Sequence, residues 1–429
     1  MAKYQAYAEY KDSGVQWLGE IPSHWKLTRL KFLAKIRNGQ DYKHVETETG
    51  FPVMGSGGQF TFSSTYMFNR PSVLLGRKGT IDKPLYIDEP FWTVDTMYYT
   101  EVNKDIDVKY FYYLSKTILF NRYSTNTALP SMTQENLNNF EFSVPPSVFE
   151  RNQIRNFLDH ETTKIDHLIE KQHQLIELLK EKRQAVISHA VTKGLNPNVP
   201  MKDSGVEWLA EVPEHWNMAP VRRYLVEHRQ GYYTTESYVD EGLKLLRITD
   251  LRDLGEINIS NCPMVNESDT THLFKLQKGD VVFARTGGAG SFGVITEDYE
   301  NLIYASYLIR FRFMNKIFEP DYLRFLFQSD SFQLSVKQNI HGGVNQNIHA
   351  EDIKNTVICA PSLSEQKEII EYLENQCLLF ENLIYKASYS VKLMQERRTA
   401  LISSAVTGKI DVRNWQAPTL AEAKTELSA

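Results

Sequence analysis

Basic and hydroxyl side chains follow two short apolar runs, at the points where a strand would end. They are Arg77, Lys78 and Thr80 after the run Ser72–Leu75, and Arg285 and Thr286 after the run Asp280–Phe283. A guanidinium at the end of a strand can reach a groove of DNA and match the two acceptors of a guanine edge, or it can bind a phosphate. The two arginines therefore predict a nucleic-acid contact that occurs twice in the chain.

Amide side chains lie in two polar loops. One loop contains Asn345 and Gln346 beside two glycines, and Asn126 lies in its counterpart in the first half of the chain. Amides match adenine edges as arginine matches guanine. Arg247 is a further candidate, because the β-like run Leu245–Asp250 carries both this cation and an acid. Any one of these residues alone is more often part of a solvated loop, and their recurrence at matched places favours a binding surface.

Motifs for catalysis lack the context that they need. Gly288, Gly290 and Gly293 form a GxGxxG match, but Val294–Thr296 then reads as a strand, whereas a nucleotide site needs a helix there. The pattern therefore predicts a glycine-rich hairpin or a loop beside a ligand. The sequence contains neither a GxxxxGK[ST] phosphate loop nor HExxH or other paired metal-ligand spacing. No catalytic residues and no metal ligands are predicted.

Two pairs of segments recur along the chain. Residues 12–25 and 203–216 are identical at ten of fourteen positions with an offset of 191, and residues 183–192 and 398–407 are identical at seven of ten with an offset of 215. The first pair carries Trp17, His24 and Trp25, which recur as Trp208, His215 and Trp216. Such self-similarity indicates two copies of one module, the second with about 24 extra residues. We predict that the histidines beside tryptophans serve packing and hydrogen bonding.

Two long amphipathic helices are predicted over 149–191 and 364–406. Their apolar residues recur mostly at spacings of three, four or seven, as in the seam of a coiled coil, with Leu168 and Leu383 at equivalent positions. Prolines precede both helices, and Ser364 is a possible N-cap of the second. At about 1.5 Å per residue, the first would be roughly 60 Å long. We expect the helices to pack on each other antiparallel; the alternative is that each lies on its own domain.

The segments between the repeats predict an α+β fold. Each combines short β-rich runs, such as Tyr304–Phe313, with one amphipathic helix, Val108–Leu119 or Pro320–Phe327. The architecture is thus two globular domains alternating with two long helices in a pseudo-two-fold internal repeat. The expected divisions are a repeated segment at 1–25, a globular domain at 26–145, a helix and linker at 146–200, the second repeated segment at 201–216, a globular domain at 217–360, a helix at 361–412 and a tail at 413–429.

The overall composition is that of a globular protein. The 429 residues include 48 Lys and Arg against 53 Asp and Glu, a net charge of −5, which excludes a uniformly basic nucleic-acid coat but allows sequence-specific binding. The three cysteines lack CxxC spacing. No apolar run is long enough to span a bilayer, and the N-terminus does not resemble a signal peptide. These features predict a chain that works in the reducing cytoplasm without a membrane.

The repeated DSGV[QE]WL[GA]E[IV]P[SE]HW segments and the RxA[VL]IS[HS]AVT helix ends resemble the specificity subunit of Type I restriction–modification systems. The likeness extends from about residue 12 to about residue 412. It implies that 26–145 and 217–360 are target-recognition domains, each reading one half of a split, asymmetric DNA site. The helices would hold these domains apart and set the gap between half-sites.

The resemblance also implies partners and cofactors. Two modification subunits would dock on the helices, bind S-adenosylmethionine and methylate adenine N6 after flipping the base. Two restriction subunits, a nuclease-translocase using ATP and Mg²⁺, would join for cleavage. This chain would bind double-stranded DNA and hold no cofactor of its own. Two alternatives stay open: an enzyme with its own methyltransferase or nuclease site, and a helical scaffold that does not touch DNA.

Overall fold

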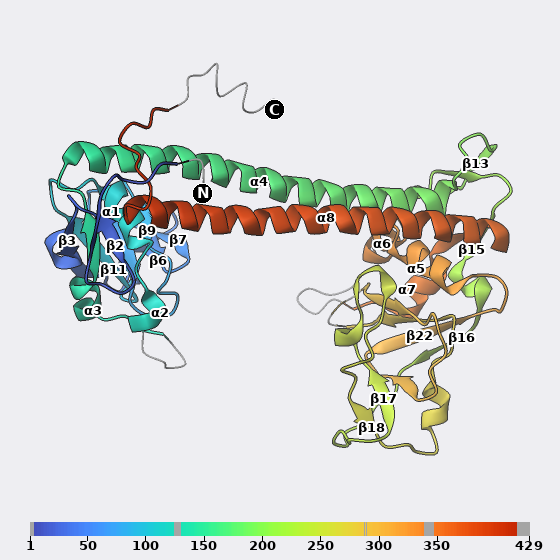
Figure 1. The fold of residues 1–429 in the computed structure, drawn as a ribbon. Helices are drawn as coiled ribbons and strands as arrows, with labels where there is room; N and C mark the ends of the chain where they lie inside the picture. The colour runs from blue at the N-terminus through green and yellow to red at the C-terminus, as the bar shows by residue number, and fades with distance from the viewer. Residues whose placement is uncertain (1–3, 124–129, 287, 289, 339–346, 418–429) are drawn as a thin grey trace. The chain divides into compact units, whose positions relative to one another are not determined.

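The computed structural model describes residues 4–123, 130–286, 288, 290–338 and 347–417. The chain forms two compact units: unit 1 comprises Met1–Gln172 with Tyr389–Ala429, and unit 2 comprises His173–Ser388. Each unit contains a globular α+β part and a portion of each of two long helices (Figure 1).

The globular part of unit 1 contains two four-stranded sheets. One is antiparallel with the order β4-β11-β8-β9; in the other, β10-β6-β7-β5, the β10–β6 pair is parallel. The strands are β4 (Ala34–Asn38), β5 (Glu46–Thr47), β6 (Phe51–Gly55), β7 (Gly58–Ser63), β8 (Ser72–Gly76), β9 (Leu85–Ile87), β10 (Trp92–Thr93) and β11 (Met97–Val102). β8 is buried along its whole length, as its apolar run predicts.

Short helices and strand pairs complete unit 1. They are η1 (Leu30–Phe32), α1 (Val108–Ser115), α2 (Phe120–Tyr123) and α3 (Gln134–Asn139), with the pairs β1 (Tyr10–Asp12)–β2 (Glu20–Pro22) and β3 (Lys26–Arg29)–β12 (Glu141–Val144). α1 begins after Asp107, whose carboxylate accepts a hydrogen bond from the Tyr110 N–H.

The globular part of unit 2 repeats this plan. Its antiparallel sheet has the order β16-β22-β19-β20, equivalent to β4-β11-β8-β9, and its second sheet, β18-β17-β21, again contains one parallel pair, β17–β21. The strands are β13 (Met201–Asp203), β14 (Glu211–Pro213), β15 (Asn217–Pro220), β16 (Leu225–Gln230), β17 (Leu243–Leu246), β18 (Met264–Val265), β19 (Asp280–Ala284), β20 (Phe292–Val294), β21 (Leu302–Tyr304), β22 (Leu308–Phe313) and β23 (Val357–Ala360).

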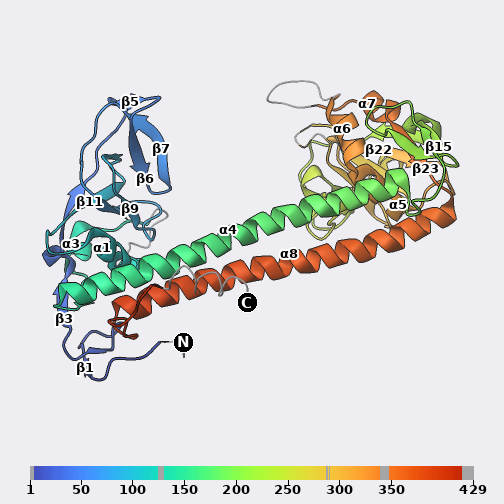
Figure 2. The ribbon, with the colours of Figure 1, turned by 90° about the horizontal axis from the view of Figure 1, so that it is seen from above.

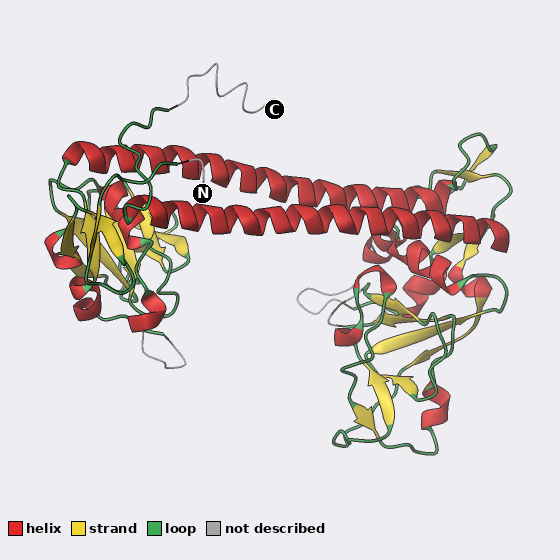
Figure 3. Ribbon diagram, viewed as in Figure 1, coloured by secondary structure: helices red, strands yellow, loops and turns green. Residues whose placement is uncertain are grey.

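The helices of unit 2 include three 3₁₀ turns between β17 and β19. The elements are η2 (Val221–Tyr224), η3 (Ile248–Asp250), η4 (Asp253–Gly255), η5 (Thr271–Phe274), α5 (Pro320–Gln328), α6 (Asp330–Gln338) and α7 (Ala350–Asn355). Much of the extra length expected of the second copy lies here, since β17 to β19 spans 243–284 whereas β6 to β8 spans 51–76. Figure 3 distinguishes the strands and helices of each unit.

The long helices are α4 (Val148–Lys193, 46 residues) and α8 (Leu363–Val406, 44 residues). In unit 1 the first half of α4 packs against the end of α8, and Arg398 binds Asp166 through two hydrogen bonds of 2.7 and 3.0 Å. In unit 2 the end of α4 packs against the beginning of α8, with Arg183 3.9 Å from Glu381. The helices are therefore antiparallel, as expected (Figure 2).

The repeated segments anchor the first turn of each long helix. In unit 1 the Trp25 indole N–H donates to Glu150 at 2.9 Å, and His24 Nε2 lies 3.0 Å from the same carboxylate. In unit 2 Trp216 and His215 contact Glu365 at 2.9 and 3.1 Å. Trp25 and Trp216 are buried, whereas Trp17 packs half-buried on Phe140 and Trp208 is exposed. The histidines thus have the structural role that the sequence predicted.

Several boundaries differ from those expected. Tyr304–Phe313 is two strands, because a turn separates β21 from β22. The helix expected to reach Leu119 ends at Ser115, and the β-like run after Leu245 ends at Leu246. The second long helix is capped by the Ser362 hydroxyl, which accepts from the Glu365 N–H at 3.3 Å, and not by Ser364.

Two further expectations need correction, one about the helix seam and one about the C-terminal tail. Leu168 and Leu383 are 38% and 39% exposed, so they lie beside the buried seam, where Ile165 and Cys377 are among the buried residues. The tail does not start at 413, because Trp415 packs on Phe157 and His160 in unit 1.

Candidate nucleic-acid interface

Arg77 and Arg285 occupy equivalent places in the two units. Each follows a fully buried strand of its antiparallel sheet, β8 or β19, and each donates its backbone N–H across the sheet, to Thr96 O at 2.9 Å and to Tyr307 O at 2.9 Å. Both side chains are half-buried. The equivalence inferred from the sequence is therefore present in the fold.

The backbone carbonyl of each arginine binds the end of the predicted polar loop in the same unit. The Met132 N–H donates to Arg77 O at 2.9 Å, and the Ile348 N–H donates to Arg285 O at 3.0 Å. At the next residue of unit 1, the Lys78 backbone forms an isolated antiparallel β-bridge with Ser131. At the equivalent residue of unit 2, the Thr286 hydroxyl donates to Asn347 Oδ1 at 2.7 Å. The arginine turn and the end of the polar loop are thus brought together in each unit.

The remaining predicted contacts divide into two groups. Lys78 and Thr80 are exposed beside Arg77. Asn126, Asn345 and Gln346 lie outside the described residues. The glycine motif is a hairpin, as expected, because β20, which contains Gly293, pairs antiparallel with β19.

Arg247, predicted to contact DNA, is hydrogen-bonded within its own turn. Its guanidinium makes two hydrogen bonds to the buried Asp250, at 3.0 and 3.1 Å, and another to Asn261 O at 3.2 Å. Although burial raises the pKa of Asp250, the hydrogen bonds and charge of Arg247 hold it below its usual value. Arg247 therefore stabilises the turn after β17, and its donors are largely committed to that turn.

Sequence reasoning missed a close backbone crossing beside both arginines. Gly39 and Gly231 follow β4 and β16, and a Cβ at either would lie 2.0 Å from Val94 O or 2.1 Å from Ala305 O. Only glycine fits such an approach without a shift of the backbone. The signal was available, because Arg37-Asn38-Gly39 and Arg229-Gln230-Gly231 match at an offset of 192.

In unit 2 the crossing and Arg285 border one cavity of about 670 Å³. Its lining includes Arg229, Gln230 and the exposed Tyr233 and Tyr307. The Gln230 amide donates to Ser306 O at 3.1 Å. A neighbouring cavity of about 470 Å³ shares Tyr233 and Tyr307 and extends the surface to Arg247. Guanidinium, amide and phenol donors thus gather on one concave surface.

In unit 1 the equivalent surface is a cavity of about 520 Å³ with different side chains. Tyr42 lines it and packs edge-on against the exposed Phe60, with ring centroids 5.1 Å apart. Arg77 reaches its edge, since its Nη1 donates to Asp95 O at 3.1 Å. Arg37, the counterpart of Arg229, is half-exposed and pairs with Glu101 at 2.8 Å.

Donor-rich concave surfaces of this kind suit base edges and phosphates more than bond-breaking chemistry. Arginine and amides can read bases directly, while tyrosine hydroxyls and backbone N–H groups bind phosphates. Among the described residues, no group of three His, Cys, Asp or Glu side chains could hold a metal ion. Within that same part of the chain, no helix is both long and apolar enough to cross a bilayer.

Comparison with known proteins identifies a family. The model of the Type I restriction modification DNA specificity domain matches residues 22–178 and 244–382, together more than half of the chain. The Type I restriction enzyme EcoBI specificity subunit of Escherichia coli is 22% identical, covering 95% of this chain and 91% of that subunit. The MjaVIII specificity subunit of Methanocaldococcus jannaschii is 23% identical over 92% of this chain and 95% of its own length.

A solved structure supports the fold. It comes from work on complex assembly and conformational transition of the type I R-M system, and its matching chain has a TM-score of 0.68 at 14% sequence identity. The match covers 91% of this chain and 99% of that chain, so the likeness in fold extends over both units and the long helices.

Proposed function

This chain belongs to the family of Type I restriction–modification DNA specificity subunits, and from that premise we propose that its two globular parts each read one half of a split, asymmetric DNA site. The observation that carries the proposal is one surface built twice on the same backbone frame with different side chains. Asn38, Asp95 and Thr96 in unit 1 stand where unit 2 has Gln230, Ser306 and Tyr307. A shared frame with different donors would read two different short sequences.

Arg77 and Arg285 are the proposed base readers. Both backbones are fixed on two sides by hydrogen bonds, which limits the entropy lost when the guanidinium binds. Lys78 and Thr80 are exposed beside Arg77 and would contact phosphates. The loops that contain Asn126, Asn345 and Gln346 would add amide contacts.

The long helices would set the gap and dock the modification subunits. Leu168 and Leu383 are equivalent in the repeat and almost equally exposed, so they offer two copies of one apolar contact. Two identical partners suit such a repeat. In this proposal those partners carry S-adenosylmethionine and the adenine-N6 methyltransferase chemistry. Two restriction subunits would bring ATP and Mg²⁺. This chain would specify the DNA sequence without catalysing a step, and the complex would act in the cytoplasm.

The proposal is tested by DNA binding of the chain assembled with its modification subunits. Arg285→Ala is expected to relax discrimination at one base pair of one half-site, with a cost of about 1–3 kcal/mol, and Arg77→Ala is expected to do the same only in the other half-site. Arg223→Ala is the matched control, because Arg223 is exposed at the opposite end of β16 from Gly231.

Three other outcomes would contradict parts of the proposal. Equal weakening on every DNA sequence, with a smaller salt slope, would make the arginines phosphate contacts. Unchanged binding would remove them from the interface. If the assembled complex binds all DNA alike, or none, the chain is a scaffold and not a reader.

A further inference from the structure

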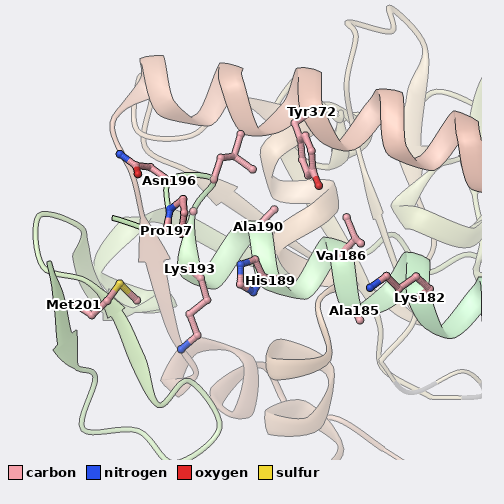
Figure 4. A pocket seen from close by; sticks show the side chains of 12 residues that line it. Lys182, Ala185, Val186, His189, Ala190, Lys193, Asn196, Pro197, Met201 and Tyr372 are labelled. Atoms are coloured by element: carbon pink, nitrogen blue, oxygen red, sulfur yellow. The ribbon is translucent and has the colours of Figure 1, made fainter. Parts of the chain in front are cut away.

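A cavity of about 890 Å³ lies on the helix pair of unit 2, away from the concave surface that contains Arg285. The end of α4 forms one wall, Tyr372 of α8 projects over it, and the segment 194–201 closes one end (Figure 4). Its basic side chains are Lys182, His189 and Lys193, and no acidic side chain is among the described residues that line it. The proposed reading of DNA gives this cavity no role.

The internal repeat shows what covers the same place in unit 1. Phe157 is equivalent to Tyr372 by the offset of 215, and it is completely buried whereas Tyr372 is 39% exposed. Phe157 is covered by Tyr4 and Trp415, whose rings pack edge-on against it at centroid distances of 5.2 and 5.5 Å. The unit 1 surface is therefore filled by two aromatic side chains.

Both aromatic residues of unit 1 lie on irregular segments at the chain ends. The Asp411 N–H donates to Gln5 O at 2.8 Å, so the two segments lie side by side. Gln153 fixes the second segment through hydrogen bonds to the carbonyls of Arg413 and Trp415 at 3.1 and 3.2 Å. Backbone pairing and inserted rings thus both contribute to the covering.

Unit 2 has one segment where unit 1 has two. The stretch 194–201 both follows α4 and precedes β13, so it takes the places of the N-terminal and the C-terminal segments of unit 1 together. In the offset of 191 it places Leu195 and Asn198 where unit 1 has Tyr4 and Tyr7, and both are exposed. Among the described residues of unit 2, the second covering segment and the two aromatic rings of unit 1 have no counterpart over Tyr372.

The glutamates in the first turns of α4 and α8 also differ in how far they are covered. Glu150 accepts hydrogen bonds from the Tyr7 hydroxyl at 2.8 Å, from Trp25 and from His24, and its side chain is almost fully buried. Glu365 contacts the equivalent Trp216 and His215, but its side chain keeps 24% of its surface exposed.

We propose that this cavity of unit 2, the α4-end groove, binds an extended segment of a partner polypeptide that inserts a Trp or Tyr ring against Tyr372. Lys182 and His189 favour a segment with acidic rather than basic side chains beside the ring, whereas the Lys193 ammonium already donates to the carbonyls of Leu209 and Glu211. The chain's own residues 418–429 contain no aromatic residue and do not fit this description. Because unit 1 fills its equivalent surface with its own chain, the groove makes the two halves of the repeat unequal.

Photo-crosslinking of the complex isolated with its natural partners tests the proposal independently of DNA reading. Benzoylphenylalanine in place of Tyr372 is expected, after irradiation and mass spectrometry, to join a peptide from a different chain that contains Trp or Tyr. The matched control carries the same probe in place of His160, which contacts Trp415 in unit 1. It is expected to crosslink to the chain's own C-terminal segment.

Crosslinks from position 372 only to this chain, to a second copy of it or to a partner segment without an aromatic residue would overturn the proposal. A binding measurement with the identified partner gives a second test. Tyr372→Ala is expected to weaken that affinity at least tenfold, whereas Tyr372→Phe retains it, with unchanged thermal unfolding in both. Equal affinity of the Ala and Phe variants would also overturn it.

Discussion

Gly39 and Gly231 show how single residues determine the shape of the candidate interface. Each allows the chain to pass a carbonyl of the neighbouring turn at a distance that no side chain would permit. In each unit an arginine, Arg37 or Arg229, precedes the glycine, and a loop that contains Tyr42 or Tyr233 follows it. At this scale the backbone frame is common to both units, and the neighbouring side chains differ.

Alanine at either glycine is expected to push the two backbone segments apart. Gly231→Ala should lower specific affinity of the assembled complex at least tenfold by disturbing one half-site, and Gly39→Ala should disturb only the other. Competition binding with DNA altered in one half-site at a time measures this, and thermal unfolding checks that the variants fold. Full affinity in both variants would contradict the close approach.

The Arg247–Asp250 pair predicts a pH-dependent difference in stability. Because the folded-state pKa of Asp250 is lowered, its contribution is present above the unfolded value of about 3.9 and is lost as the pH falls through the lower folded value. Asp250→Asn should therefore reduce the free energy of unfolding by about 1–3 kcal/mol at pH 7. Denaturant unfolding at pH 7 and at pH 3.5 checks this, since the gap between variant and parent should narrow at the lower pH.

The three cysteine thiols should be unreactive in the folded chain. All three are buried, and burial raises the pKa of Cys262 and Cys359 to about 12 and also raises that of Cys377. A raised pKa leaves little thiolate at pH 8. Iodoacetamide at that pH is expected to modify the native chain far more slowly than the denatured chain, and rapid labelling of native protein would contradict this.

At the scale of the elements, the helix seam was only partly predictable. Apolar spacing located both long helices to within two residues, but it could not separate Ile165, which is buried, from Leu168, which is exposed. Both lie in an apolar stripe wider than the contact with the partner helix. In the proposed function the exposed leucines contact a docked modification subunit, and the periodicity of one chain carries no information about such a subunit.

The seam gives a matched pair of substitutions. Ile165→Ala should lower the free energy of unfolding by about 2–5 kcal/mol, because it leaves a cavity in the buried cluster of unit 1. Leu168→Ala should change stability by less than about 1 kcal/mol and instead weaken assembly with the modification subunits. Denaturant unfolding and analytical ultracentrifugation separate the two effects, and a stability loss at Leu168 as large as that at Ile165 would contradict the assignment.

The site was predictable in outline and not in detail. Arg77 and Arg285 could be paired from the sequence because they follow buried strands at a constant offset. Arg247 could not be judged, since its binding to Asp250 depends on a 3₁₀ turn that reads as a strand in sequence. Tyr233 and Tyr307, 74 residues apart along the chain, are brought to one cavity only by the sheet.

At the scale of the whole molecule, duplication explains both the resemblance and the differences between the units. The anchoring of Trp25 and Trp216 on the first turn of each long helix is the same in both, whereas the concave surfaces carry different donors. The covering of Phe157, absent at Tyr372, adds a second asymmetry on the helices. If these two unlike surfaces read DNA as proposed, the composite DNA site has two unlike halves.

Single-molecule methylome sequencing of the source cell, with and without the gene for this chain, tests that central claim most directly. The account predicts that deletion removes N6-methyladenine from one split motif with two different half-sites, and that restoring the gene restores it. An unchanged methylome, with the modification subunits shown to be expressed, would contradict the assignment of this chain as the reader of DNA sequence.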